Sequence, residues 1–215
     1  RLWDVATGAE NLRLDDTGRT AALDVSDDNE LIATGGAEGT AVIWDANRGD
    51  RLATLTGHDA EVTALAFAPG GQLLATGDDL GDFRLWRFNP AANEWQGAEW
   101  LRGHSRTITA MTFADDGARL ITSSGDNTCG QWDVAAGKEI RAGVLKHPEW
   151  VTDIVVSDDG RTALTSCDDG KLRLWSLADA KLLQTMESPP AASLKTDSDS
   201  AEAAKTQTAF TSIDM

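Results

Sequence analysis

The side chains best suited to acid–base chemistry or to metal binding are the three histidines of the chain. Imidazole titrates near neutral pH and is a common metal ligand, so converging histidines would suit catalysis or a zinc site. A shared offset of 28 residues separates each histidine from a later tryptophan; the pairs are His58 with Trp86, His104 with Trp132, and His147 with Trp175. This offset predicts one histidine per structural repeat, and therefore a structural role rather than a common catalytic site.

Acidic turns and two cysteines are the other candidates for chemistry. The acidic segments lack the alternating ligand spacing of a calcium loop, which favours turns; they are Asp27-Asp28, Asp115-Asp116-Gly117 and Asp158-Asp159-Gly160. Cys129 and Cys167 have no metal-type spacing, and Cys129 is expected at an inward-facing position of a strand, where it packs in the core. The sequence has no nucleophile elbow, phosphate-binding glycine loop or zinc motif. We therefore expect no catalytic residue, no cofactor and no metal.

The charge of the chain limits its partners. It has 19 Lys and Arg against 35 Asp and Glu, and its formal net charge is −16. Such a surface repels phosphate groups, so neither nucleic acid nor an anionic membrane is an expected partner. The sequence contains no run of about 18 apolar residues, so no membrane insertion is expected. The two cysteines fit buried thiols better than a disulfide framework, which slightly favours a cytoplasmic protein.

Tryptophans divide the chain into repeats of 41, 42, 46 and 43 residues; they are Trp3, Trp44, Trp86, Trp132 and Trp175. A threonine lies 10 residues before each of the last four tryptophans, namely Thr34, Thr76, Thr122 and Thr165. An apolar residue lies 19 before them, namely Val25, Phe67, Phe113 and Val156. A period in the low forties that ends in an apolar–Trp–Asp triplet is typical of propeller blades.

These offsets, with the pairs Gly57-His58 and Gly103-His104, resemble the tryptophan–aspartate (WD) repeat β-propeller family over residues 1–187. The resemblance implies an all-β propeller of four-stranded antiparallel blades. Full blades are expected at 18–57, 60–103, 106–146 and 149–187, and a partial blade at 1–14. The family usually closes a ring of seven blades, so the missing blades are expected from residues upstream or from another chain. This would make the chain part of a larger chain or complex.

Strand and loop positions follow from the same register. In the fourth blade, alternation and turn residues predict strands at 150–156, 162–166, 171–175 and 181–186. Residues 89–99 are expected to form an extended loop that contains Trp95 and accounts for the 46-residue spacing. Residues 188–215 change composition and are expected to be a linker or tail, in which Thr206–Ile213 could add as a strand to an exposed edge.

The resemblance also implies a hydrogen-bonded network in each blade, made by a histidine, a threonine, an aspartate and the tryptophan. Complete sets are expected in the last two blades, as His104, Thr122, Asp126 and Trp132, and as His147, Thr165, Asp169 and Trp175. The first two blades depart from this pattern. Asp16 and Glu38 occupy the histidine and aspartate positions of the first, and Leu80 replaces the aspartate of the second. Incomplete networks are therefore expected there.

Partner binding is expected on the propeller face that carries the turn between the second and third strands. In the family, contacts often come from the position just before the first strand; here these residues are Arg19, Glu61, Thr107 and Trp150. A second set flanks the tight turn: Ala37, Asp79, Gly125 and Asp168. Trp150 is the expected anchor, because an exposed Trp supplies a large apolar area at little entropic cost. The alternative is that it packs sideways against the adjacent blade.

Two functions remain open from the sequence. The first is a non-catalytic protein-interaction scaffold, in which Glu61, Asp79 and Asp168 favour a partner with a basic segment. The second is a structural subunit, or the propeller region of a larger signalling or enzyme complex whose active part lies outside this chain. Catalysis in the central channel is disfavoured, because the histidines already have structural assignments.

Overall fold

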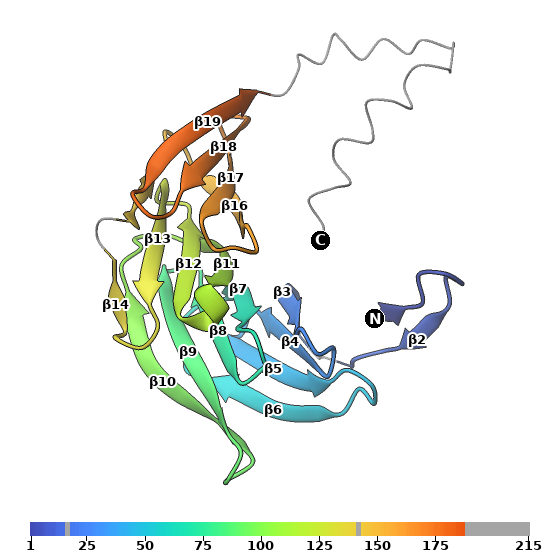
Figure 1. The fold of residues 1–215 in the computed structure, drawn as a ribbon. Helices are drawn as coiled ribbons and strands as arrows, with labels where there is room; N and C mark the ends of the chain where they lie inside the picture. The colour runs from blue at the N-terminus through green and yellow to red at the C-terminus, as the bar shows by residue number, and fades with distance from the viewer. Residues whose placement is uncertain (16–17, 141–142, 188–215) are drawn as a thin grey trace, which may run out of the picture.

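The computed structural model describes residues 1–15, 18–140 and 143–187, and almost all regular structure in them is β. Four antiparallel sheets stand side by side along an arc (Figure 1), and strands follow one another in chain order within each sheet. The prediction of an all-β fold built from four-stranded antiparallel blades is confirmed. Among the described residues there is no helix with the length and apolarity needed to cross a bilayer.

The blades are numbered 1 to 4 in chain order. Blade 1 contains β3 (Thr20–Val25), β4 (Leu31–Gly36), β5 (Thr40–Asp45) and β6 (Arg51–Thr56). Blade 2 contains β7 (Val62–Phe67), β8 (Leu73–Asp78), β9 (Asp82–Asn89) and β10 (Glu94–Arg102). Ahead of blade 1, β1 (Leu2–Trp3) and β2 (Glu10–Leu12) form a two-stranded sheet.

Blade 3 contains β11 (Ile108–Ala114), the 3-10 turn η1 (Asp115–Gly117), β12 (Arg119–Ser124) and β13 (Thr128–Asp133). Its outer position is shared by two short strands that both pair with β13: β14 (Lys138–Glu139) and β15 (Leu145–Lys146). Blade 4 contains β16 (Val151–Val156), β17 (Thr162–Cys167), β18 (Lys171–Ser176) and β19 (Lys181–Glu187). The strands of blade 4 begin and end within one residue of the expected positions.

The first strand of each blade is innermost, and β3, β7, β11 and β16 contact one another in that order. Turns therefore gather on two faces. We call the face with the turns between the second and third strands the upper face, and the opposite face the lower face. Gly81, in the upper turn of blade 2, has φ +91°, and a Cβ there would lie 2.7 Å from the Arg106 carbonyl oxygen. Only glycine permits so close an approach between blades 2 and 3.

The core lies between the blades, and each repeat tryptophan packs toward the preceding blade. Trp86 joins a buried cluster with Ile43 and Leu55 of blade 1. Trp132 packs edge-on against Phe83 of blade 2, with ring centroids 4.6 Å apart. The corresponding residue of blade 4, Trp175, joins the cluster of blade 3. Each blade thus buries its apolar face only against a neighbour, which is how repeat proteins are stabilised.

The segment expected as an extended loop is instead a long β-hairpin. Strand β9 continues to Asn89 and β10 starts at Glu94, which leaves only a short turn. Trp95 pairs with Phe88 across the hairpin and lies 6.2 Å from the ring of Phe67. These aromatic contacts supply the cross-strand packing that a polar loop would lack, and so the strands extend. The expectations for Asp16 and for residues 188–215, including Thr206–Ile213, lie outside the described residues.

Candidate functional site

Blade 2 contains a complete hydrogen-bonded network, contrary to expectation. Trp86 Nε1–H donates to Thr76 Oγ1 over 2.8 Å, and Thr76 Oγ1 lies 2.7 Å from His58 Nε2. The other ring nitrogen of His58 contacts Asp78 Oδ2 at 2.8 Å. Leu80, at the expected aspartate position, is an exposed residue of the turn. The carboxylate comes instead from Asp78, two residues earlier, which is the last residue of β8.

Blade 3 brings its four expected residues together. Trp132 donates to Thr122 Oγ1 over 2.9 Å, and Thr122 Oγ1 lies 2.8 Å from His104 Nε2. His104 Nδ1 lies 2.9 Å from Asp126 Oδ2, and Asp126 Oδ1 accepts a 2.6 Å hydrogen bond from Thr128. Burial opposes ionisation of Asp126, but the hydrogen bonds from His104 and Thr128 outweigh it and hold the pKa of this carboxyl well below its usual value.

Blade 4 departs from expectation at the aspartate. His147 Nε2 lies 2.8 Å from Thr165 Oγ1, which also accepts from Trp175 over 3.0 Å. Asp169, however, is held by Arg173, whose Nη1–H donates to Asp169 Oδ1 over 3.0 Å. Within the described part of the chain, buried His147 Nδ1 has no hydrogen-bond partner. A nearby guanidinium attracts a carboxylate more strongly than a neutral imidazole does, so the aspartate turns away from the histidine.

The described part of blade 1 shows one link of the network. Trp44 Nε1–H donates to Thr34 Oγ1 over 2.9 Å, and Glu38 is exposed in the upper turn. Across blades 2 and 3 the histidine side chains are only 1–2% exposed, and both ring nitrogens of each are occupied. Such histidines tie the upper loops to the strands, because a paired buried network specifies one geometry. They do not line an open site.

The residues expected to bind partners do gather on the upper face. In every blade the two sets are joined by one backbone hydrogen bond, donated by the turn residue to the residue that precedes the first strand. The pairs and distances are Ala37 to Arg19, 3.2 Å; Asp79 to Glu61, 3.0 Å; Gly125 to Thr107, 3.0 Å; and Asp168 to Trp150, 2.9 Å. The repeat therefore places one such pair on each blade, around the axis.

Contacts between blades connect these pairs. Arg19 Nε of blade 1 lies 3.8 Å from Glu61 Oε1 of blade 2. Thr107 of blade 3 donates to Asp79 Oδ1 of blade 2 over 2.5 Å. These side chains thus bridge neighbouring blades, so Arg19, Glu61, Asp79 and Thr107 have structural partners on this face. Exposed ion pairs of this kind contribute little to stability.

Trp150 combines the two alternatives considered for it. Its ring lies over Gly125 of blade 3, where an added Cβ would come within 3.0 Å of Trp150 Cδ2. The side chain nevertheless remains 39% exposed, and the guanidinium of Arg106 lies 5.8 Å from its ring centroid. A pocket of about 310 Å³ opens beside it. Sequence reasoning named Asp126 only for the histidine network and missed Ser105, Arg106, Asn127 and Glu149, because these lining residues belong to blades 3 and 4 and meet only in the fold.

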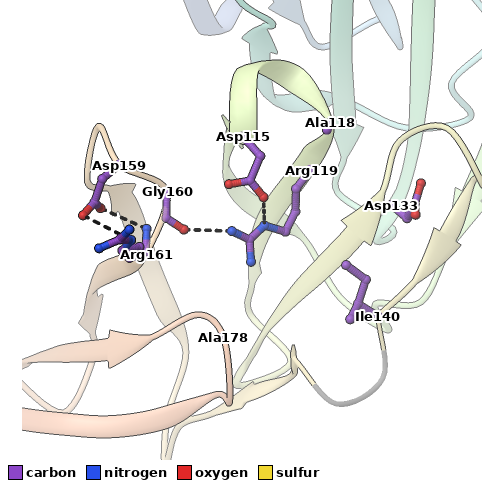
Figure 2. A pocket seen from close by; sticks show the side chains of 9 residues that line it. All are labelled: Asp115, Ala118, Arg119, Asp133, Ile140, Asp159, Gly160, Arg161 and Ala178. Carbon is purple, nitrogen blue, oxygen red and sulfur yellow. Dashed lines mark hydrogen bonds and ion pairs between the residues drawn. The ribbon is translucent and has the colours of Figure 1, made fainter.

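A second pocket, of about 490 Å³, lies on the lower face between blades 3 and 4 (Figure 2). The guanidinium of Arg119 is already paired there: its Nε lies 2.9 Å from Asp115 Oδ2, and its Nη2 donates to the Gly160 carbonyl over 2.8 Å. Behind it, buried Gln131 accepts from Arg119 Nη1 over 2.8 Å and donates to the Leu177 carbonyl over 3.1 Å. The hydrogen bonds of Arg119 and Gln131 beside this pocket therefore join blades 3 and 4.

Gln131→Leu should lower the free energy of unfolding by about 2 kcal/mol, because Arg119 and two carbonyl groups lose buried hydrogen-bond partners. The second carbonyl is that of Gly143, to which Gln131 donates over 2.8 Å. Urea denaturation measures the loss, and Gln184→Leu on exposed β19 is the matched control. Equal denaturation midpoints for Gln131→Leu and the parent chain would show that the hydrogen bonds of Gln131 do not contribute to stability.

Comparison with known proteins agrees with this geometry. The family described as WD domain, G-beta repeat matches residues 17–45, 49–87, 98–133 and 140–176. Pre-mRNA-processing factor 19 of Oryza sativa subsp. japonica is 28% identical over 116 residues, which is 54% of this chain and 22% of that protein. The guanine nucleotide-binding protein subunit beta of Zea mays is 29% identical over 128 residues, 58% of this chain and 34% of that protein.

A shorter match, to nuclear distribution protein nudF of Aspergillus oryzae, is 45% identical over 60 residues, 28% of this chain and 13% of that protein. The chain therefore spans about a third or less of each of these relatives. Together, the fold, the repeated network and the exposed upper loops define a β-propeller interaction module. The matched segments cover more than half of the sequence, and the chain belongs to the WD-repeat family, whose members act as protein-interaction scaffolds.

Proposed function

We propose that this chain is a non-catalytic scaffold that binds a partner protein through its upper face, with Trp150 as the anchor. The observation that carries the proposal is the position of this indole. It lies on Gly125, stays 39% exposed, and forms a wall of the 310 Å³ pocket. Tryptophan is enriched at interface hot spots, because it supplies a large contact area at little cost in conformational entropy.

Around Trp150, carboxylates outnumber the one cation that lines the pocket, Arg106, and this favours a basic segment in the partner. Glu149 precedes it in the chain, and exposed Asp168 is joined to its carbonyl by a backbone hydrogen bond. Glu61 and Asp79 add two further carboxylates to this face, both on blade 2. A lysine- or arginine-containing segment would gain favourable electrostatic steering toward this face of a chain with net charge −16. Nucleic acid and membranes would be repelled by the same charge.

Trp150→Ala should weaken binding of such a partner at least about tenfold while the melting temperature stays nearly unchanged, because much of the ring is exposed. Immobilised parent and variant chains would be incubated with extract from the source cells, and each captured protein quantified by mass spectrometry. The double variant Glu149→Lys/Asp168→Lys should lose the same partner.

The control is Leu183→Ala, which removes a half-exposed apolar side chain from outer strand β19. A variant of the other tryptophan of interest, Trp95, would be unsuitable as a control, because its ring packs against Phe67 and Phe88 and its removal would affect stability. The upper-face assignment is wrong if every captured protein still binds the Trp150→Ala variant. It is also wrong if the Leu183→Ala variant loses the same proteins to the same extent. A large fall in melting temperature with binding intact would show that Trp150 only joins blades 3 and 4.

A further inference from the structure

A groove lies on the outer side of the molecule, between blades 1 and 2 near the lower face. Its cavity measures about 450 Å³. Strand β6 forms one wall through Leu52, Ala53, Thr54 and Leu55, and the β9–β10 hairpin forms the other through Phe88, Asn93, Glu94 and Trp95. We call this the side groove. It is separate from the upper face, and none of its lining residues belongs to the histidine networks.

The wall made by the hairpin is peculiar to blade 2. Strand β9 has 8 residues, whereas the third strand of each other blade has 6. The added length is the reason for the 46-residue spacing before Trp132. Trp95 is held in the wall by Phe67 and Phe88, at ring-centroid distances of 6.2 and 5.6 Å. The hairpin is therefore a packed element that could form a stable wall for a ligand.

The opposite wall is the edge of a sheet. Strand β6 is last in blade 1 and, among the described residues, pairs only with β5. Successive side chains of a strand point to opposite faces, yet four consecutive residues of β6 line the cavity. The groove therefore borders the edge of β6, and among the described residues Leu52–Leu55 pair with no strand other than β5. An extended peptide can add to such an edge as a further strand.

The lining of the side groove specifies the chemistry of that peptide. Its apolar surface comes from Leu31, Leu55, Phe88, Trp95 and Leu52, of which Leu52 is 53% exposed. Every charged side chain in the lining is a carboxylate, from Asp28, Glu30 and Glu94. A fitting segment would present apolar side chains at alternate positions and lysine or arginine at its ends.

We propose that the side groove binds an extended, basic-flanked apolar segment of a partner protein, which adds as a strand to the free edge of β6. This gives the scaffold a second docking surface, independent of Trp150. One partner could then engage both surfaces, or two partners could be held together. Strand addition supplies affinity through the backbone, and the aromatic wall and acidic rim supply selectivity.

The test uses a random library of 12-residue peptides displayed on phage and selected on the full chain. We expect enriched peptides with apolar residues at alternate positions and flanking Lys or Arg. The best peptide, made synthetically with a fluorophore, is titrated against purified variants by anisotropy. Leu52→Arg should weaken its binding at least about tenfold, because a bulky cation would enter the groove. Leu183→Arg is the matched control on half-exposed β19 and should bind as the parent does.

Other outcomes would overturn the proposal. These are the absence of an enriched peptide, enriched peptides without basic residues, and equal binding to the parent and to Leu52→Arg. A synthetic peptide of residues 204–215 is tested in parallel, and tight binding of it would assign the groove to the chain's own tail instead. Trp150→Ala should leave the selected peptide bound, so a failure here is distinguishable from a failure of the upper-face proposal.

Discussion

Asp78→Ala should lower the free energy of unfolding by about 3 kcal/mol, because it removes a buried carboxylate that accepts three hydrogen bonds. Asp78 is 1% exposed. Its Oδ2 lies 2.8 Å from His58 Nδ1, and its Oδ1 accepts hydrogen bonds of 3.0 Å from the backbone N–H groups of Leu80 and Asp82. Without it, the imidazole and the upper turn of blade 2 lose their acceptor. Urea denaturation followed by tryptophan fluorescence measures the change.

Asp79→Ala is the matched control, because it removes the neighbouring carboxylate, whose side chain is exposed. It should cost well under 1 kcal/mol, as exposed polar contacts usually do. Leu80→Ala should also cost little, since Leu80 is 59% exposed. Asp126→Ala in blade 3 should match Asp78→Ala in direction. If Asp78→Ala and Asp79→Ala have the same midpoint, the network of blade 2 contributes nothing to stability.

His147 should make the protein progressively less stable as the pH falls from about 6.5 to about 4. Burial, with the positive charge of Arg173 adding to it, lowers the pKa of His147 to about 4. The unfolded chain binds a proton at this histidine near pH 6.5, well before the native chain does, so acid favours unfolding. The contribution is complete above about pH 7, and a shift of this size corresponds to a loss of about 3 kcal/mol by pH 4.

His147→Gln tests this, because glutamine does not titrate and its amide can still hydrogen-bond Thr165. Between pH 7 and pH 4.5, the free energy of unfolding of the parent chain should fall more steeply than that of the variant. The carboxyls of Asp126 and Asp169 act in a different window. Their pKa values are held below the ordinary value, so the stability they add is lost only below about pH 4. Parallel pH profiles for parent and His147→Gln would refute the assignment.

The two arginines that precede a repeat tryptophan by two positions show how context decides a contact. Arg173 of blade 4 bonds Asp169 and thereby leaves His147 without its acceptor. Arg84 of blade 2 instead stacks on Trp86 and Trp100, at 4.3 and 5.2 Å from the ring centroids. Trp100 is available because β10 is unusually long, and Asp78 is engaged by His58. The same residue type at the same repeat position therefore has two different roles.

The sequence by itself determined the fold class, the strand positions of blade 4 and the Thr–Trp hydrogen bond, which recurs in all four blades at 2.8–3.0 Å. These features depend on local alternation, turn residues and a fixed offset of 10 residues, all of which are properties of one repeat. The sequence also placed one pair of upper-face residues on each blade, since one backbone hydrogen bond within the blade joins them.

Only the tertiary structure decided which carboxylate pairs with which histidine, and where surfaces from different blades come together. Asp78 takes the place of Leu80 as the partner of His58, and Asp169 pairs with Arg173 and not with His147, because a carboxylate pairs with the strongest donor near it in space and not with the one at the expected spacing. The Trp150 pocket and the side groove each combine two blades. Their chemistry depends on packing between repeats, and a periodic pattern within one repeat carries no information about that packing.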